Sequence, residues 1–177
     1  MSWSEGRAPT RRAVLAALVA LPACGFTPVY GPDGAARGLS GQIAVDPPRD
    51  ENSYLFVREL ETRLGRAAAP SYRLAASIDV NREGLGFTPA GDITRVRLNG
   101  SLRYTLRETG SRRQVAAGRI RSFTAYSSPV VSRRRTSIAG NPVTVEAAER
   151  DAIERLMTIL ADRLVSELLA TAPDWRR

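Results

Sequence analysis

The chain contains 177 residues with a formal net charge of +8, and 43% of its residues are hydrophobic and 25% charged. This composition is that of an ordinary globular domain, which excludes both a disordered chain and a polytopic membrane protein. All 26 basic residues are arginine, because neither lysine nor histidine occurs. The sequence therefore excludes histidine-activated nucleophiles, imidazole metal sites and catalytic lysines. The single cysteine, Cys24, can form no intramolecular disulfide.

The first 23 residues have the layout of a secretory signal peptide. A basic region that contains Arg7, Arg11 and Arg12 precedes an uncharged apolar run at 13–21. As a helix this run would span about 14 Å, half of the ~30 Å hydrocarbon core, so we expect no permanent transmembrane helix. The adjacent arginines leave both general secretion and twin-arginine export open.

The signal ends in Leu21-Pro-Ala-Cys-Gly, which resembles the bacterial lipobox. We expect residues 1–23 to be removed and Cys24 to be lipidated, so that acyl chains such as palmitate anchor the chain to a membrane. The alternative is an ordinary export signal that leaves Cys24 as a free thiol, which an oxidising compartment disfavours. Residues 24–40 are rich in Gly and Pro and predict a flexible tether.

A strand and a helix open the folded part. Residues 42–45 predict a short strand, which two prolines end. Asp50 or Asn52 is placed to cap a helix that runs through Leu64 with apolar residues at helical spacing. Gly65 then provides the C-terminal stop.

Three further strands follow, each recognised by apolar and polar residues that alternate with period two. They are predicted over 72–81, 93–106 and 114–126. Turns are expected at 84–91 and 108–111, where Gly and Pro or Gly and Ser gather.

The C-terminal part predicts a loop and a long helix. Residues 127–142 form a loop of a length that is often functional. An apolar stripe over 145–168 then predicts a helix of roughly 25 residues, capped by Asn141 or Thr144. We expect residues 173–177 to form a frayed C-terminal tail.

The predicted order is β-α-β-β-β-α, in a single α+β domain over residues 41–172. Amphipathic elements of this kind bury their apolar faces by packing in layers. We therefore expect a two-layer sandwich in which two helices pack on one face of a four-stranded sheet. The other face of the sheet is expected to be polar.

The lipobox, the stretch Gly-Phe-Thr-Pro-Val-Tyr-Gly at 25–31 and this element order together resemble the LPS-assembly lipoprotein family LptE, of the alphaproteobacterial type. The resemblance implies an outer-membrane lipoprotein of the periplasmic face. It also implies that the chain plugs and helps assemble the LptD β-barrel and binds lipopolysaccharide on its way to the cell surface. It implies no catalytic residue and no cofactor. Gly25, rather than Asp, after the cysteine agrees with sorting to the outer membrane.

Arginines gather at two places that we expect to bind lipopolysaccharide or other anions. Guanidinium groups suit phosphate and carboxylate equally, and the export signal argues against nucleic acid. The alternative is a solvated sheet face in a genome that uses Arg in place of Lys. The candidates on the strands and in the loop are Arg95, Arg97, Arg103, Arg119 and Arg121, and Arg133, Arg134 and Arg135.

Two other functions stay open at this point. The first is another lipid-anchored periplasmic adaptor, such as a pilot protein of a different outer-membrane complex. The second is a carboxylate-based hydrolase, which needs two acids that converge in a cleft. The sequence offers only scattered candidates for such a pair, among them Asp79 and Glu83. We therefore expect no enzyme and no metal site.

Overall fold

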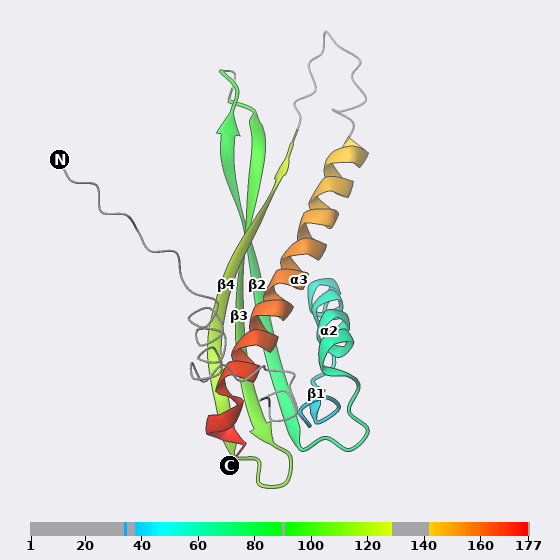
Figure 1. Cartoon of the computed structure of the whole chain (residues 1–177). Coiled ribbons are helices and arrows are strands. Elements are labelled where there is room, and N and C mark those ends of the chain that lie inside the picture. The colour runs from blue at the N-terminus through cyan, green and yellow to red at the C-terminus, as the bar shows by residue number, and fades with distance from the viewer. Residues whose placement is uncertain (1–33, 35–37, 90, 129–141, 177) are drawn as a thin grey trace, which may run out of the picture.

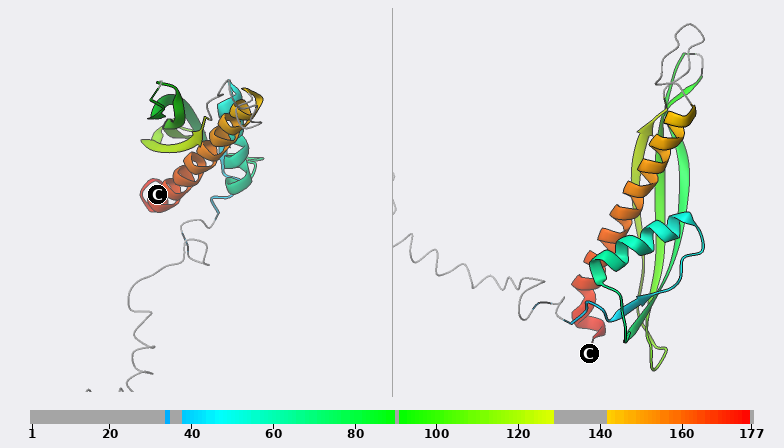
Figure 2. Two further views of the ribbon diagram at one scale, coloured as in Figure 1. Left: turned by 90° about the horizontal axis from the view of Figure 1, so that it is seen from above. Right: turned by 90° about the vertical axis from the view of Figure 1, so that its right-hand side faces the viewer.

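The computed structural model describes residue 34 and residues 38–89, 91–128 and 142–176. Two helices lie on one face of a four-stranded sheet with strand order β1-β2-β3-β4 (Figures 1 and 2). This confirms the predicted α+β sandwich and its order β-α-β-β-β-α. The elements are β1 (Ile43–Val45), α2 (Glu51–Leu64), β2 (Tyr72–Phe87), β3 (Ile93–Glu108), β4 (Gln114–Ser127) and α3 (Pro142–Trp175).

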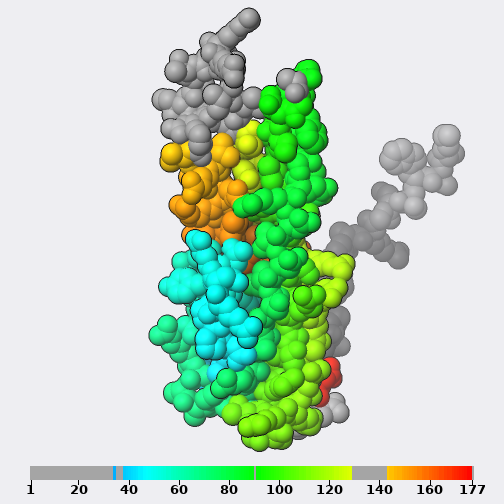
Figure 3. Space-filling view, turned by 180° about the vertical axis from the view of Figure 1, so that it is seen from behind, coloured from blue at the N-terminus to red at the C-terminus, as the bar shows by residue number. Residues whose placement is uncertain are grey.

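The sheet is long and twisted because three of its strands form an antiparallel meander of 16, 16 and 14 residues. β1 contributes only three residues and pairs in parallel with the start of β2, from Tyr72 to Leu74. Figure 1 shows α3 running beside the sheet along its length, whereas α2 lies over the part next to β1. From behind, β2 and β3 are uncovered by either helix (Figure 3).

Helix α2 begins at a capping box. Asp50 Oδ1 accepts a hydrogen bond of 2.7 Å from the backbone N–H of Ser53, and Ser53 Oγ accepts one of 2.9 Å from the N–H of Asp50. Of the two caps predicted, the structure selects Asp50 over Asn52. The helix ends at Gly65 as predicted, where a φ of +74° favours glycine.

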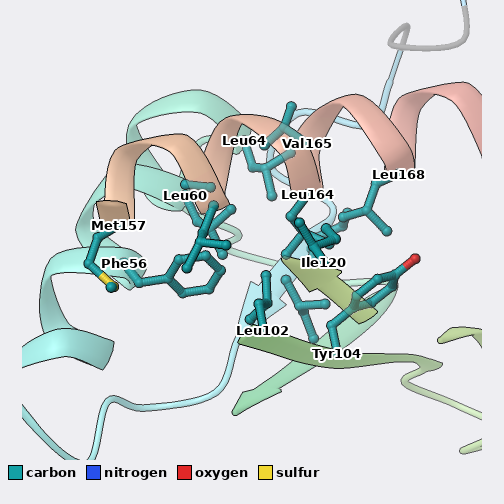
Figure 4. Packing of buried hydrophobic residues seen from close by; sticks show 14 of the residues in the cluster. Phe56, Leu60, Leu64, Leu102, Tyr104, Ile120, Met157, Leu164, Val165 and Leu168 are labelled. Atoms are coloured by element: carbon teal, nitrogen blue, oxygen red, sulfur yellow. The ribbon is translucent and has the colours of Figure 1, made fainter. Parts of the chain in front are cut away.

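The core lies between the helices and the inner face of the sheet (Figure 4). Leu98 and Leu102 of β3 are fully buried against α3, together with Leu156 and Leu160. Gly100 lies between the two strand leucines, and a Cβ at this position would be 3.1 Å from the side chains of Leu156 and Leu160. The absence of a side chain there lets α3 approach the sheet closely.

Two predicted boundaries change. Leu39 is 1% exposed and belongs to the core, so the predicted tether over 24–40 is wrong at its end and the domain begins before residue 41. β2 continues through Gly84 and Gly86 to Phe87, and the turn covers only the residues after it. Both glycines lie at register shifts, where an irregular strand tolerates the missing side chain better than a regular one.

Helix α3 has 34 residues rather than roughly 25, and it includes part of the expected tail. Trp175 is 6% exposed, and its ring lies edge to face against Tyr72 at 5.0 Å between centroids. Its indole N–H donates a hydrogen bond of 3.1 Å to Thr171. The prediction of a frayed tail from 173 is therefore wrong for Trp175, because a partner from β2 holds it. Leu168 and Leu169, near the end of α3, are buried as well.

Candidate anion-binding face

The face of the sheet that points away from α2 and α3, here called the outer face, collects arginines. Strand alternation and register place the five predicted strand arginines on it: Arg95, Arg97, Arg103, Arg119 and Arg121. Their neighbours along the strands, such as Leu102 and Ile120, point inward and are buried. The sequence prediction that these arginines share one face is confirmed by the register.

Two further arginines, Arg73 and Arg107, belong to the outer face and were not among the candidates. Arg107 has the same parity in β3 as the predicted arginines of that strand, and Arg73 alternates in β2 with the buried Leu74; this alternation is the signal that would have identified both. Arg73 lies directly opposite Arg107, and Arg103 lies directly opposite Arg119. Like charges at directly opposed positions destabilise a sheet. The outer face therefore contains two unfavourable cross-strand pairs.

Few of these charges are neutralised by the residues that the structure describes. Arg73 pairs with Asp46 at 3.3 Å and Arg97 with Glu83 at 3.6 Å. Within the described residues, the remaining outer-face guanidinium groups have no carboxylate within ion-pair distance; they belong to Arg95, Arg103, Arg107, Arg119 and Arg121. Among the described residues, Arg103, Arg119 and Arg121 in the middle of the face therefore have no ion-pair partner, although Asp79 lies in the same row as Arg121.

Arg97 differs from the other outer-face arginines because it contacts the side chains of Phe123 and Glu83. Its guanidinium carbon lies 5.1 Å from the centroid of the Phe123 ring, a cation–π arrangement. Asn99 Nδ2 also donates a hydrogen bond of 3.0 Å to Glu83, the carboxylate that pairs with Arg97. Arg97 is thus less available to a ligand than the unpaired arginines.

Two hollows border or indent the sheet. One, of about 510 Å³, lies where β1 stops, between the linker after Val45, the start of α2 and the edge of β2, and Arg103 contributes to it. The other, of about 410 Å³, lies on the outer face itself and includes Arg121 and Phe123. The unpaired arginines therefore border both.

The inner face carries polar groups that attach α3 to the sheet. The Tyr104 hydroxyl donates to Glu167 at 2.6 Å, and the Tyr126 hydroxyl donates to Glu149 at 3.0 Å. Burial, and then the neighbouring carboxylate, raises the pKa of Tyr104. Thr124, also buried, donates to the Ala152 carbonyl at 3.0 Å. Each of these groups thus has a partner across the interface between α3 and the sheet.

The acids considered for a hydrolase do not converge. Asp79 and Glu83 lie on the same strand and face, four residues apart. At about 3.3 Å per residue their Cα atoms are ~13 Å apart, and side chains on one face of a strand stand roughly parallel, so the carboxyl groups are not brought to the ~6.5–9.5 Å of an inverting glycosidase. Glu83 is also engaged by Asn99 and Arg97. The geometry does not support a hydrolytic pair here.

The other predicted positions lie outside the described residues. They are the lipidation site Cys24 and the loop arginines Arg133, Arg134 and Arg135. Among the helices that the structure describes, none is both long enough and apolar enough to cross a membrane.

Solved structures with the same fold include two lipoproteins. A protein of Caulobacter crescentus CB15 described as a lipoprotein superposes with a TM-score of 0.63 at 21% identity, covering 81% of this chain and 98% of its own. The rare lipoprotein B of Shewanella oneidensis superposes with a TM-score of 0.50 at 15% identity, covering 77% and 98%. No curated protein matches the chain by sequence.

The model of one protein family, LptE, described as lipopolysaccharide-assembly, matches residues 41–168. This range contains every strand, all of α2 and most of α3. Since the match covers most of the chain and agrees with the family that the sequence predicts, the chain belongs to the LptE lipopolysaccharide-assembly family.

Proposed function

We propose that this protein is an outer-membrane lipoprotein, anchored on the periplasmic face through Cys24, that binds lipopolysaccharide through its outer face. Membership of a lipopolysaccharide-assembly family supports the general role. The lipobox around Cys24 supports the anchor. The role is one of binding and assembly, for which no catalytic group is needed.

One observation carries the binding proposal, namely that Arg103 lies opposite Arg119 with no carboxylate partner for either within the described residues. Opposed Cβ atoms in an antiparallel pair are about 4.5–5.5 Å apart, so a single phosphate can reach both guanidinium groups. An anion bound there would replace repulsion with charge-assisted hydrogen bonds. Arg121 lies one row further along β4 and would contact the same ligand.

We further propose that the domain plugs an LptD-like β-barrel and helps it to assemble. Family membership supports a place in the lipopolysaccharide transport machinery. The elongated body in Figure 1 suits a partner that surrounds its long axis. The competing proposal is an adaptor or pilot protein for another outer-membrane complex.

Affinity for lipopolysaccharide tests the binding proposal. Arg103→Glu together with Arg119→Glu should weaken binding at least tenfold at ~0.15 M salt, because two charge-assisted contacts of ~1.5–3 kcal/mol each are lost. The matched control is Arg150→Glu with Arg155→Glu on α3, which changes the net charge equally at two exposed arginines. Equal affinity of the two double variants would reject the outer face as the binding site.

Co-purification from outer membranes tests the barrel proposal. The full-length chain with a C-terminal tag should retain a large β-barrel protein in near-equal amount. Recovery of a different complex in that ratio would favour the adaptor proposal instead. The Arg103→Glu, Arg119→Glu variant is useful in this experiment as well. If it loses lipopolysaccharide binding but still co-purifies with the barrel, lipopolysaccharide binding and barrel association are separate roles.

A further inference from the structure

The hollow of about 410 Å³ lies in the middle of the outer face, between the arginines. Small-molecule sites commonly have volumes of about 300–1,000 Å³. The register places its side chains in two adjacent rows across β2, β3 and β4. The rows are Asn81, Asn99 and Phe123, and Asp79, Ser101 and Arg121.

The hollow exists because short side chains are flanked by long ones. Ser101 and Asn99 lie at its centre on β3, between Arg97 on one side and Arg103 on the other. Arg103 and its opposite residue Arg119 form the next row beyond Arg121. A ligand in the hollow would therefore border the unpaired arginines of the proposed anion site.

Several polar groups that line the hollow have no partner in the part of the chain that the structure describes. Among the described residues, the side chains of Asp79, Asn81, Ser101 and Arg121 form no hydrogen bond or ion pair with one another or with any other group. They comprise a carboxylate, an amide, a hydroxyl and a guanidinium. Together they offer both donors and acceptors to a ligand.

This mixture does not suit a bare phosphate. Asp79 is placed opposite Ser101, in the same row as Arg121, and its carboxylate would repel an anion in the hollow. A sugar hydroxyl, in contrast, donates to a carboxylate and accepts from an amide or a guanidinium. The polar lining therefore favours a polyhydroxylated ligand, with anionic groups only at the end near Arg121.

Phe123 adds an aromatic surface. The ring is 61% exposed on an otherwise polar face, and Arg97 lies over it. The face of an aromatic ring is electron-rich, so it attracts the weakly positive C–H groups of a sugar ring as well as excluding water from them. An exposed aromatic beside hydroxyl-binding groups has the elements of a saccharide subsite.

We infer that this hollow binds a sugar ring of a phosphorylated saccharide, stacked on Phe123 and hydrogen-bonded to Asp79 and Asn81, with its phosphate at Arg121, Arg103 and Arg119. The inference rests on the proposed function, because it assigns the sugar part of the same ligand. It adds that recognition depends on hydroxyl groups and not on charge alone.

Calorimetric titration of the purified full-length chain in detergent tests the inference, with intact and fully deacylated lipopolysaccharide as probes. Phe123→Leu removes the ring but keeps an apolar side chain, and it should weaken binding of the deacylated probe about fivefold or more. Phe123→Trp should bind as the parent does. Phe87→Leu is the matched control, since Phe87 is 62% exposed but lies at the hairpin tip, outside the hollow.

Asp79→Asn distinguishes sugar from phosphate in the hollow by the sign of its effect. A carboxylate that accepts from hydroxyls binds them better than an amide, so the substitution should weaken binding of the deacylated probe. Stronger binding would mean that the hollow holds phosphate, and it would overturn the inference. All these side chains are exposed or partly exposed, and unchanged melting temperatures would exclude a folding effect.

The inference and the proposed function fail in different ways. If Phe123→Leu and Asp79→Asn bind the deacylated probe like the parent while Arg103→Glu with Arg119→Glu does not, the sugar subsite is overturned and the proposed function stands. If the parent binds no intact lipopolysaccharide, the proposed function falls and the subsite falls with it.

Discussion

The hydroxyl of Tyr104 on β3 donates a hydrogen bond of 2.6 Å to Oε1 of Glu167 on α3, at a distance of 63 residues along the chain. Tyr104 is 4% exposed, so its hydroxyl depends on this acceptor. Opposite Tyr104 on β4 lies Gly118, and a Cβ there would be 2.8 Å from both Glu167 Oε1 and the tyrosine ring. The helix, the ring and the glycine therefore form one packing unit.

Tyr104→Phe should lower the free energy of unfolding by about 1–3 kcal/mol, because it leaves the partly buried Glu167 carboxylate without its donor. Urea denaturation measures the change. Glu167→Leu removes the acceptor and provides the second arm of a double-mutant cycle, and the two losses should not add. Additive losses would show that the two residues act independently.

Gly100→Ala should also destabilise the fold, by about 1–3 kcal/mol, because the new methyl group would overpack the fully buried Leu156 and Leu160. Gly110→Ala is the matched control, since a Cβ at Gly110 meets nothing within 4 Å. Thermal melts of both variants test this. A melting temperature of Gly100→Ala equal to that of the control would mean that α3 shifts freely.

Trp175→Ala should cost about 3–5 kcal/mol, the usual loss for a buried aromatic residue. The substitution removes the edge-to-face contact between Trp175 and Tyr72 and leaves a cavity between α3 and β2. Asp174→Ala, one residue away and exposed, should leave stability unchanged. Urea denaturation of both variants tests this. Equal stability of Trp175→Ala and Asp174→Ala would mean that the C-terminal end of α3 does not contribute to the fold.

Stability should fall as the solution is acidified, because two carboxylates lose their charge: that of Glu59 on α2 and that of Asp50 at its N-cap. A hydrogen bond from Arg63 lowers the pKa of Glu59, and one from the Ser53 backbone lowers the pKa of Asp50. Since each folded-state pKa lies below its ordinary value, 4.5 for Glu59 and 3.8 for Asp50, their contribution is present at neutral pH and disappears as the pH falls through the folded-state values.

Asp50→Asn with Glu59→Gln should therefore reduce the difference in unfolding free energy between pH 6 and pH 3. Asparagine can still cap a helix, so the comparison isolates the charge. Urea denaturation of the parent and the double variant at each pH provides the measurement. An identical loss in both proteins would assign the acid sensitivity to other groups.

Cys24→Ala should leave a chain that folds but does not stay bound to membranes, because the core of the described residues begins at Leu39 and the proposed lipid supplies the membrane anchor. Growth with a radiolabelled fatty acid, followed by membrane fractionation, tests this. The parent should carry label and sediment with the membranes. Label on the Cys24→Ala protein would exclude lipidation at this residue.

Much of the fold could be predicted because alternation and helical spacing report directly on which face of each element is buried. The odd-numbered arginines of β3 alternate with Leu98 and Leu102, so their common face follows from the period alone. Asp50 and Gly65 mark the ends of α2 through local hydrogen bonding and backbone conformation. These are properties of short segments, which a sequence carries within itself.

The register and the distant contacts could not be predicted in this way, because they depend on residues far apart in the chain. Arg103 lies opposite Arg119 because of the register between β3 and β4. This register depends on the turn that connects the two strands and on the register shift after Leu106. Local sequence predicts a tail at Trp175, because the residue that holds it, Tyr72, is 103 positions earlier in the sequence. Likewise, Phe123 lines a hollow because β2 and β3 place short polar side chains beside it. Local patterns along the chain therefore predict the elements and their buried faces, whereas the side chains that meet across the sheet follow from the register, because pairing depends on the position of each strand relative to its neighbours.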